Sequence, residues 1–241
     1  MRIIIEPNYE KMSKKAALMV ASQVRLKPES VLGLATGSTP RGMYNELINM
    51  YEKNEIDFSD VITFNLDEYH DLSPENPQSY HYYMYHNFFK HINIKEKNYH
   101  LLEGTTSNIE RECNQYDKKI QQAGGIDLQI LGIGPNGHIG FNEPGEKLNV
   151  TTHLVDLTEE TINANSRFFD SKANVPQQAL TVGIATILKS DRIILLASGK
   201  NKAEAIKQTV NDNLTTQVPS SLLQTHPEVT LIIDEDAASL L

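Results

Sequence analysis

The chain has 241 residues, of which 39% are hydrophobic and 22% are charged, and these proportions exclude collagen-like and intrinsically disordered proteins. Lys and Arg total 22 against 31 Asp and Glu, so the formal net charge is -9, and this sign disfavours nucleic acid and anionic lipid surfaces as partners. A small anionic substrate is still allowed, because backbone N–H groups with one or two cations can hold a phosphate whatever the net charge.

The other compositional limits concern metals, disulfides and membranes. A single cysteine, Cys113, excludes an internal disulfide, a Cys-rich metal site and an iron–sulfur cluster, and it indicates a reducing compartment. His81, His86 and His91 recur every five residues, a spacing that does not align them on one helix face, so no metal site is predicted. No apolar run reaches the roughly 20 residues of a membrane span, and the N-terminal residues lack the pattern of a signal peptide. We therefore expect a cytoplasmic protein.

Short apolar runs alternate along the chain with segments whose apolar spacing is near 3.6 residues, such as residues 8–25 and 108–122. This alternation predicts an α/β fold with a mostly parallel sheet and helices on both faces. No linker, repeat or low-complexity tract interrupts it, so residues 1–241 are expected to form one domain. The predicted strands are residues 2–5, 31–35, 61–64, 99–102, 126–133, 152–157, 192–197 and 229–233.

Residues 67–91 depart from the alternation, and four of the ten tyrosines lie between residues 80 and 85. The segment reads as a partly buried helix opened by Ser79 after Pro77, and simple packing of its aromatic rings is favoured over contact with a ligand. Because the segment follows a strand end, where α/β enzymes often build a lid, residues 67–91 are also a candidate lid.

In open α/β sheets, ligands bind beyond the carboxyl ends of the strands. Residues 33–40 read Gly-Leu-Ala-Thr-Gly-Ser-Thr-Pro, in which Pro40 suits the first turn of a helix and the turn before it offers N–H groups and hydroxyls to an anion. The segment lacks the Gly-Lys-Ser/Thr ending of a P-loop and the three-glycine dinucleotide fingerprint. Ordinary helix capping and a phosphate cradle explain this turn equally well.

A second strand end, residues 61–69, places two adjacent carboxylates, Asp67 and Glu68, at the edge of the sheet. Adjacent side chains of an extended backbone point to opposite sides, so at most one of them should face a cleft. A solvated acidic turn is the equal alternative.

Residues 130–144 carry the most specific signal in the chain. A buried strand ends there in glycines that let the backbone approach a ligand, and His138 follows with Glu143 five residues later. Imidazole is suited to proton transfer near neutral pH, and a carboxylate on its second nitrogen fixes its orientation. With Asn136 also nearby, the segment favours a catalytic histidine over a structural one.

Two cations follow this segment, Arg167 and Lys202, and the second lies just after the predicted strand 192–197. A surface charge is the commoner role for each. In a chain this acidic, however, a Gly-Lys-Asn-Lys turn after a strand suits the second half of a phosphate site.

Together, five motifs resemble the glucosamine-6-phosphate deaminases in that family's order and spacing, over nearly the whole chain. They are LATGSTP at residues 34–40, FNLDEY at 64–69, GIGPNGHIGFNEP at 132–144, NSRFF at 165–169 and ALTVG at 179–183.

This resemblance implies a Rossmann-like fold without a redox cofactor, and the conversion of D-glucosamine 6-phosphate and water to D-fructose 6-phosphate and ammonia. It implies that His138 helps to open the sugar ring, that Asn136 and Glu143 orient His138, and that Asp67 moves the C2 proton to C1. The implied substrate-binding residues, which would hold the phosphate, are Thr36, Gly37, Ser38, Thr39, Arg167 and Lys202.

Two departures from the longer members of that family matter. Asn136 stands where those members carry Asp, which leaves Glu143 as the anionic partner of His138. The chain ends at Leu241, short of their C-terminal extension, and His153 and Val155 replace basic effector-binding residues. The resemblance therefore implies a short, non-allosteric form, either a monomer or a small homo-oligomer.

Two other functions are alternatives to this one. A 6-phosphogluconolactonase has a similar glycine-rich His segment, but lactone hydrolysis does not require the proton-transfer residues around Asp67 or the residues that orient His138. A sugar-phosphate sensor that has lost turnover would keep the fold, since fold alone does not establish function. The proton-transfer positions that remain in the chain argue against a sensor.

We predict that N-acetylglucosamine 6-phosphate does not activate the protein. Initial rates measured against glucosamine 6-phosphate, with and without that compound, should superimpose. A clear rise in rate, or a sigmoidal curve made hyperbolic by the compound, would contradict the prediction.

Overall fold

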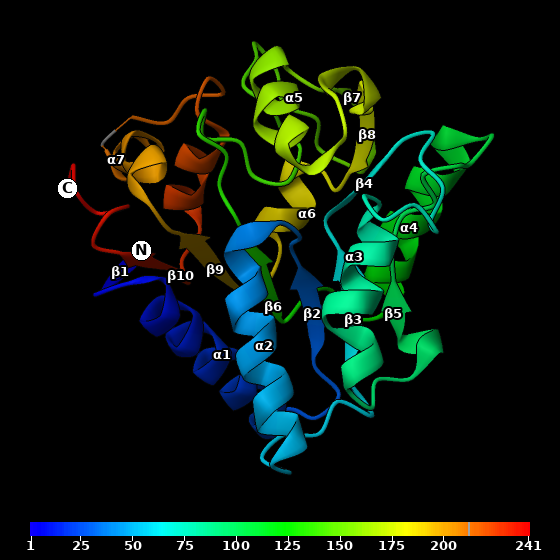
Figure 1. Ribbon diagram of the computed structural model, residues 1–241, viewed down its shortest axis with the longest axis vertical. Coiled ribbons are helices and arrows are strands. Elements are labelled where there is room, and N and C mark those ends of the chain that lie inside the picture. Colours follow the sequence, from blue (N-terminus) through cyan, green and yellow to red (C-terminus); the bar gives the residue numbers. More distant parts are fainter. Residues whose placement is uncertain (212) are drawn as a thin grey trace.

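The computed structural model describes residues 1–211 and 213–241, which form two sheets with helices around them (Figure 1). The larger sheet has seven strands in the order β1-β10-β9-β6-β2-β3-β5, and every neighbouring pair in it is parallel. The smaller sheet has the order β4-β8-β7 and is antiparallel. The strands are β1 Arg2–Glu6, β2 Val31–Leu34, β3 Ile62–Asn65, β4 Asp67–Tyr69, β5 Tyr99–His100, β6 Leu128–Leu131, β7 His153–Asp156, β8 Gln178–Thr181, β9 Arg192–Ala197 and β10 Val229–Asp234.

Helices cover both faces of the larger sheet, as the alternating pattern predicts. In β9, Ile193 and Leu195 pack into a core with α4, α6 and α7, whereas Ile194 and Leu196 pack on the opposite face with α1, α2 and α3. The α-helices are α1 Tyr9–Leu26, α2 Ser38–Glu52, α3 Tyr80–Asn87, α4 Ile109–Gln122, α5 Glu159–Asn165, α6 Ile184–Leu188 and α7 Ala203–Val210. The 3-10 helices are η1 Phe89–His91, η2 Glu96–Asn98, η3 Ser166–Phe168, η4 Lys172–Asn174, η5 Lys200–Lys202 and η6 Pro219–Thr225.

Three of these helices begin where the sequence places a capping residue. The side chains of Asn8 and Asn108 each accept a hydrogen bond from the amide three residues on, at 3.0 Å, and open α1 and α4. Ser79 does the same for α3, which confirms the predicted helix after Pro77. Met84 and Phe88 are buried in the core, so the second half of the candidate lid at residues 67–91 packs onto the larger sheet, while its first residues form β4 of the smaller sheet.

The smaller sheet is where the structure departs most from the predicted elements. β4 and β8 were not predicted, and β7, which was expected within the parallel sheet, pairs antiparallel with β8. The predicted strands 99–102 and 126–133 are shorter in the structure, at Tyr99–His100 and Leu128–Leu131. The solvated acidic turn, offered as an equal alternative, is wrong, because Asp67 and Glu68 are both buried.

The chain enters the smaller sheet directly from β3. The Leu66 amide still donates to the Leu34 carbonyl of β2 at 3.0 Å, while its carbonyl accepts from the Val182 amide at 2.7 Å. Asp67 then pairs with Thr181 of β8. The first residue of β4 is thus placed just beyond the carboxyl edge of the larger sheet. Within the described residues, no helix has both the length and the apolarity that crossing a membrane demands.

Candidate active site

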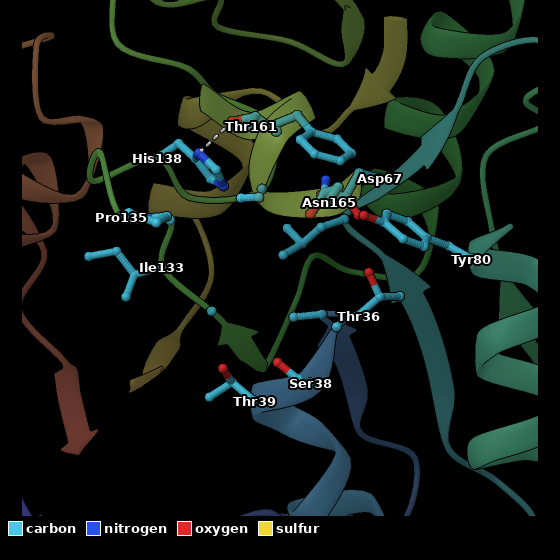
Figure 2. A pocket seen from close by; sticks show the side chains of 18 of the residues that line it. Thr36, Ser38, Thr39, Asp67, Tyr80, Ile133, Pro135, His138, Thr161 and Asn165 are labelled. Atoms are coloured by element: carbon cyan, nitrogen blue, oxygen red, sulfur yellow. Dashed lines mark hydrogen bonds between the residues drawn. The ribbon is translucent and has the colours of Figure 1, made fainter. Parts of the chain in front are cut away.

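One cavity lies beyond the carboxyl ends of β2, β3, β6 and β9, and segments distant in the sequence line it (Figure 2). Figure 2 shows Asp67 and His138 on different sides of this cavity, with Thr36, Ser38 and Thr39 on a third side at the start of α2. Eight of the ten predicted site residues line it, and they are Thr36, Gly37, Ser38, Thr39, Asp67, His138, Arg167 and Lys202. The other two, Asn136 and Glu143, lie behind His138.

The turn after β2 presents backbone donors to the cavity. Gly37 has a φ of +98°, a conformation that favours glycine, and it opens α2 without any side-chain cap. The first-turn N–H groups of α2 are therefore not used by a capping side chain, and Pro40, in the same turn, has no N–H to satisfy. Such a helix start is a site for an anion.

Tyrosine hydroxyls hold the carbonyl side of the same turn. Tyr44 donates to the Ala35 carbonyl at 2.6 Å, Tyr83 to that of Gly37 at 2.6 Å, and Tyr9 to that of Ser38 at 2.9 Å. These three side chains come from α2, α3 and α1, so three helices fix one turn. With its carbonyls engaged in this way, the turn offers its N–H groups and hydroxyls to the cavity.

Two cations complete this part of the cavity. A guanidinium nitrogen of Arg167 lies 3.5 Å from the Ser38 hydroxyl, and Lys202 lines the same cavity from η5. Burial, and then the charge of Arg167, lower the pKa of Lys202 to about 8. The two positive charges repel each other, so an anion that contacts both of them stabilises their charged forms.

The buried carboxylate of Asp234, at the end of β10, fixes the turn that precedes Lys202 through hydrogen bonds. This carboxylate accepts hydrogen bonds from the Gly199 amide at 3.0 Å, from the Ala237 amide at 2.8 Å and from the Ser198 hydroxyl. Gly199 has a φ of +91°, so the turn needs glycine at this position. Asp234 thereby sets where η5 starts and where Lys202 lies.

His138 is oriented by a buried carboxylate. Its Nδ1 lies 3.3 Å from Glu143 Oε2 and 3.4 Å from the Thr161 hydroxyl. The Asn136 amide donates to Glu143 at 2.9 Å and its oxygen accepts from the His138 backbone N–H, so Asn136 orients the ring through Glu143 and through the loop. Nε2 is left as the nitrogen that can exchange a proton with a ligand.

Glycine lets the imidazole ring lie against the strand end. A Cβ on Gly134 would sit 2.3 Å from Cε1 of His138 and 2.4 Å from its Nδ1, closer than any real contact. The glycine-rich motif therefore has a direct physical reason at this position.

The Glu143 carboxyl is held in its ionised form. Its burial acts to raise its pKa, but the bonds from His138, Thr161 and Asn136 outweigh burial and lower the pKa below its ordinary value. An ionised Glu143 favours a proton on Nδ1 of His138 and stabilises the imidazolium when Nε2 is also protonated.

Asp67 has the opposite surroundings. Within the described chain, no backbone or side-chain group donates a hydrogen bond to its carboxyl, which faces the cavity. Burial, with a further contribution from the neighbouring Glu68, raises the pKa of Asp67 to about 8. A carboxylate of such high proton affinity is a strong base for a group bound in the cavity.

The structure adds residues to the site that the sequence did not single out. Tyr80 lines the cavity, although packing was the favoured role for its segment, and its ring stacks on Phe141 with centroids 6.0 Å apart. Thr161 donates to Glu143, and the Asn165 amide donates to the Tyr69 hydroxyl at 3.0 Å. Asn165 lies inside the motif at residues 165–169, which was a usable signal, whereas nothing in the local pattern marks Thr161.

The arrangement combines a carboxyl of raised pKa, a histidine held by a carboxylate and a helix start suited to an anion. Across the described residues, no cluster of three or more His, Cys, Asp and Glu side chains could hold a metal ion. The groups present suit an anionic substrate on which protons are moved from one atom to another.

A scan against protein families matches residues 8–232 to the model for glucosamine-6-phosphate isomerases/6-phosphogluconolactonase. This match spans far more than half of the chain. The chain belongs to this isomerase/lactonase family.

Relatives within the family are close in sequence. A glucosamine-6-phosphate deaminase of Halothermothrix orenii is 71% identical over 241 residues, covering all of both chains. One from Clostridium acetobutylicum is 58% identical over the same length, again covering all of both chains. The chain is similar to both of these proteins over its whole length.

Solved structures of the family share the fold. A monomeric glucosamine-6-phosphate deaminase superposes with a TM-score of 0.98 at 46% identity, and the match covers all of both chains. The 6-phosphogluconolactonase of Trypanosoma brucei superposes with a TM-score of 0.81 at 17% identity, over 100% of this chain and 98% of that one. At 17% identity, the similarity to the lactonase shows only that the two proteins share a fold.

We predict that Asp67→Asn stabilises this family member increasingly as the pH rises. An unfolded Asp loses its proton near its ordinary pKa of 3.8, whereas the folded protein keeps the Asp67 proton up to about pH 8. The free energy of unfolding of the wild type therefore falls across this interval, and the variant, which cannot titrate there, escapes the loss.

Thermal melts of both proteins at matched ionic strength test this prediction. The difference in Tm, variant minus wild type, should grow between about pH 5 and about pH 8 and then level off. A difference that stays the same at every pH would contradict a raised pKa for Asp67.

Proposed function

We propose that the protein is a glucosamine-6-phosphate deaminase, a hydrolase that acts on the carbon–nitrogen bond of an amino sugar phosphate. It converts D-glucosamine 6-phosphate and water to D-fructose 6-phosphate and ammonia, a step of amino sugar breakdown. One observation carries the proposal: the carboxyl of Asp67 and the imidazole of His138 face a single cavity whose third side is the anion-binding turn. The names of the relatives at 71% and 58% identity support it.

Ring opening is the step for which His138 is suited. The cyclic sugar must lose the proton of its C1 hydroxyl and gain one on the ring oxygen, so one group has to accept and then donate. Nε2 of His138 does both, while Nδ1 stays beside Glu143 at 3.3 Å. The products of this step are the open-chain aldehyde and an unchanged enzyme.

Isomerisation follows and uses Asp67. The open-chain C2 proton is acidic because the C1 carbonyl stabilises the resulting enolamine, and the Asp67 carboxylate removes that proton. The proton returns at C1, while the C1 oxygen gains a proton and the C2 nitrogen gives one up, which leaves a C1 hydroxyl and an imine at C2. Water adds to the imine carbon and ammonia leaves, so the balance is one water consumed and one ammonia released. The reaction needs no redox cofactor.

The phosphate is held at the other end of the cavity. The proposed contacts are Thr36, Gly37, Ser38 and Thr39 of the turn before and at the start of α2, with Arg167 and Lys202 facing them. This arrangement accounts for how a chain with a net charge of -9 selects a phosphorylated substrate.

Several finer properties belong to the same proposal. Residues 67–91 contribute Asp67 and Tyr80 to the cavity within a single domain, and any closing movement involves this segment. The protein acts in the cytoplasm, because phosphorylated sugars do not cross membranes unaided, and it acts as a monomer, as the structural relative does. The small sugar phosphate is its partner, and neither nucleic acid nor a membrane is.

A time course with purified protein tests the function directly. Ammonia and fructose 6-phosphate should appear in equal amounts from glucosamine 6-phosphate, and glucosamine without the phosphate should react poorly. Hydrolysis of 6-phosphogluconolactone alone would assign the protein to the other activity of its family, and binding without turnover would assign it a sensor role.

We predict that Asp67→Asn lowers kcat for deamination by about a thousandfold or more, since a carboxamide cannot remove the C2 proton. The amide keeps the size of the side chain, so the affinity for the sugar phosphate should change little. Isothermal titration at low temperature separates binding from turnover. Near-normal kcat in this variant would remove Asp67 from its proposed role.

For Lys202→Ala we predict the reverse division. The ammonium would contact the phosphate equally in the ground state and in the transition state, so KM should rise about tenfold or more with little change in kcat. Lys200→Ala, which removes a cation from the same 3-10 helix but not from the cavity lining, serves as the matched control. A loss of kcat at constant KM would contradict the assignment.

A further inference from the structure

Glu68 is a buried carboxylate to which the proposed reaction gives no part. It follows Asp67 in β4, is only 1% exposed, and points away from the cavity, because successive strand residues face opposite sides. Burying an unpaired charge costs free energy, so a buried Glu68 needs groups around it that stabilise its carboxylate.

Four donors converge on this carboxylate. Oε1 accepts from the backbone amides of Tyr69 at 2.8 Å and Tyr80 at 2.9 Å. Oε2 accepts from the backbone amide of His81 at 2.9 Å and lies 2.8 Å from Nδ1 of the same residue. Backbone amides can only donate, so three of them stabilise a negative charge on Glu68.

From these contacts we infer that Glu68 is a positioning residue with two effects on the site: it fixes a negative charge beside Asp67, and its hydrogen bonds hold Tyr80 against the cavity. This inference deepens the proposed function and rests on it for the kinetic consequences.

The electrostatic effect follows from adjacency and burial. Like charges on neighbouring residues in a medium of low dielectric disfavour ionisation of the second group. Because four donors stabilise a negative charge on Glu68, ionisation of Asp67 places a second negative charge beside the first. Once ionised, Asp67 is a correspondingly stronger base toward a carbon acid.

The positioning effect runs through the first turn of α3. Glu68 binds the amides of Tyr80 and His81, the first two residues of that helix, and so fixes its start to β4. Tyr80 then packs against Tyr69, with ring centroids 4.9 Å apart, and against Phe141, and these two rings also contact each other. The ring therefore forms a rigid wall of the cavity beside Asp67.

Other ionisable groups near Asp67 also act on its ionisation. Its cavity is also faced by cations from η3 and η5, whose positive charge favours the ionised form of Asp67, and by the imidazole after β6, which does so only when it is protonated. These groups are Arg167, Lys202 and His138, and the neighbouring phenols are Tyr44, Tyr69, Tyr80 and Tyr116. A test must therefore change the charge of Glu68 while these groups stay in place.

Glu68→Gln removes the charge and keeps the size of the side chain. We expect the acid limb of the kcat/KM profile to move to lower pH by about one unit, since the like charge beside Asp67 is gone. The high-pH plateau should fall several-fold because the base is weaker. Ionisations of the substrate are identical for both enzymes and cancel when the two profiles are divided.

A direct titration separates this inference from the proposed function. In protein labelled with 13C at the aspartate carboxyl carbons, the Asp67 resonance is the one missing from Asp67→Asn. Its midpoint should move to lower pH in Glu68→Gln, whether or not the protein turns over glucosamine 6-phosphate. The control is Glu75→Gln, which removes an exposed carboxylate from the same segment and should leave the midpoint unchanged.

Replacement of His81 supplies a second test that leaves the Glu68 carboxylate intact. The His81 side chain is 27% exposed, so a lysine there can place an ammonium against Glu68. His81→Lys should lower the Asp67 midpoint relative to the neutral variant His81→Gln. An Asp67 midpoint that is the same in wild type and Glu68→Gln, or the same in both His81 variants, would overturn the electrostatic effect.

The positioning effect has its own readout. In Glu68→Gln one backbone donor of α3 faces an amide nitrogen in place of an oxygen, so the near-ultraviolet circular dichroism of the Tyr69–Tyr80 pair should change. KM for the sugar phosphate should stay within about twofold of wild type, because Glu68 itself makes no hydrogen bond to the turn before α2 or to the two cations. An unchanged tyrosine spectrum would overturn the positioning effect.

Discussion

The site depends on the point at which the chain leaves the larger sheet. Leu66 donates to Leu34 of the parallel sheet and accepts from Val182 beside the smaller sheet, so one residue belongs to both hydrogen-bond systems. With the two sheets joined there, Asp67 cannot remain at the edge of a strand as an ordinary solvated carboxylate. It is carried over the cavity as the first residue of β4, opposite Thr181, and its desolvation follows from that placement.

At the proposed anion site, local hydrogen-bond donors and cations outweigh the repulsion that the negative net charge of the protein exerts on an anion. A net charge of -9 repels anions at long range, and solvent screens that repulsion within about 10 Å at ordinary salt concentrations. At contact distance, the turn after β2 offers backbone N–H groups because tyrosine hydroxyls from three helices engage its carbonyls. The tyrosines that pack between the helices thus also hold the turn in the conformation that the proposed phosphate contact requires.

The sequence was sufficient for the parts of the site that lie in continuous motifs. His138 and Glu143 meet because the four residues between them turn the chain back, with Asn142 bonded to Ile139. Gly134 precedes this turn, and a side chain there would collide with the His138 ring. β4 and β8 were missed because strands of three and four residues, one of them reading Asp-Glu-Tyr, resemble a polar turn. Asp234 and Thr161 act across the fold, on a turn and on a carboxylate far away in the sequence, so no local pattern could have revealed them.

Three buried carboxyl groups lie at or beside the cavity, and they differ in the number of hydrogen-bond donors that surround them. Glu143 receives hydrogen bonds from Asn136 and Thr161 and lies beside His138, so its charge is stabilised and serves to orient the ring. Glu68 receives three backbone amides and holds a helix start. Asp67 receives none from the described chain, and its carboxyl faces the cavity. The number of donors that the fold supplies thus decides what each carboxyl is suited to do. Of these three, only Asp67, which has no donor in the described chain, keeps the high proton affinity on which the proposed carbon-acid chemistry depends.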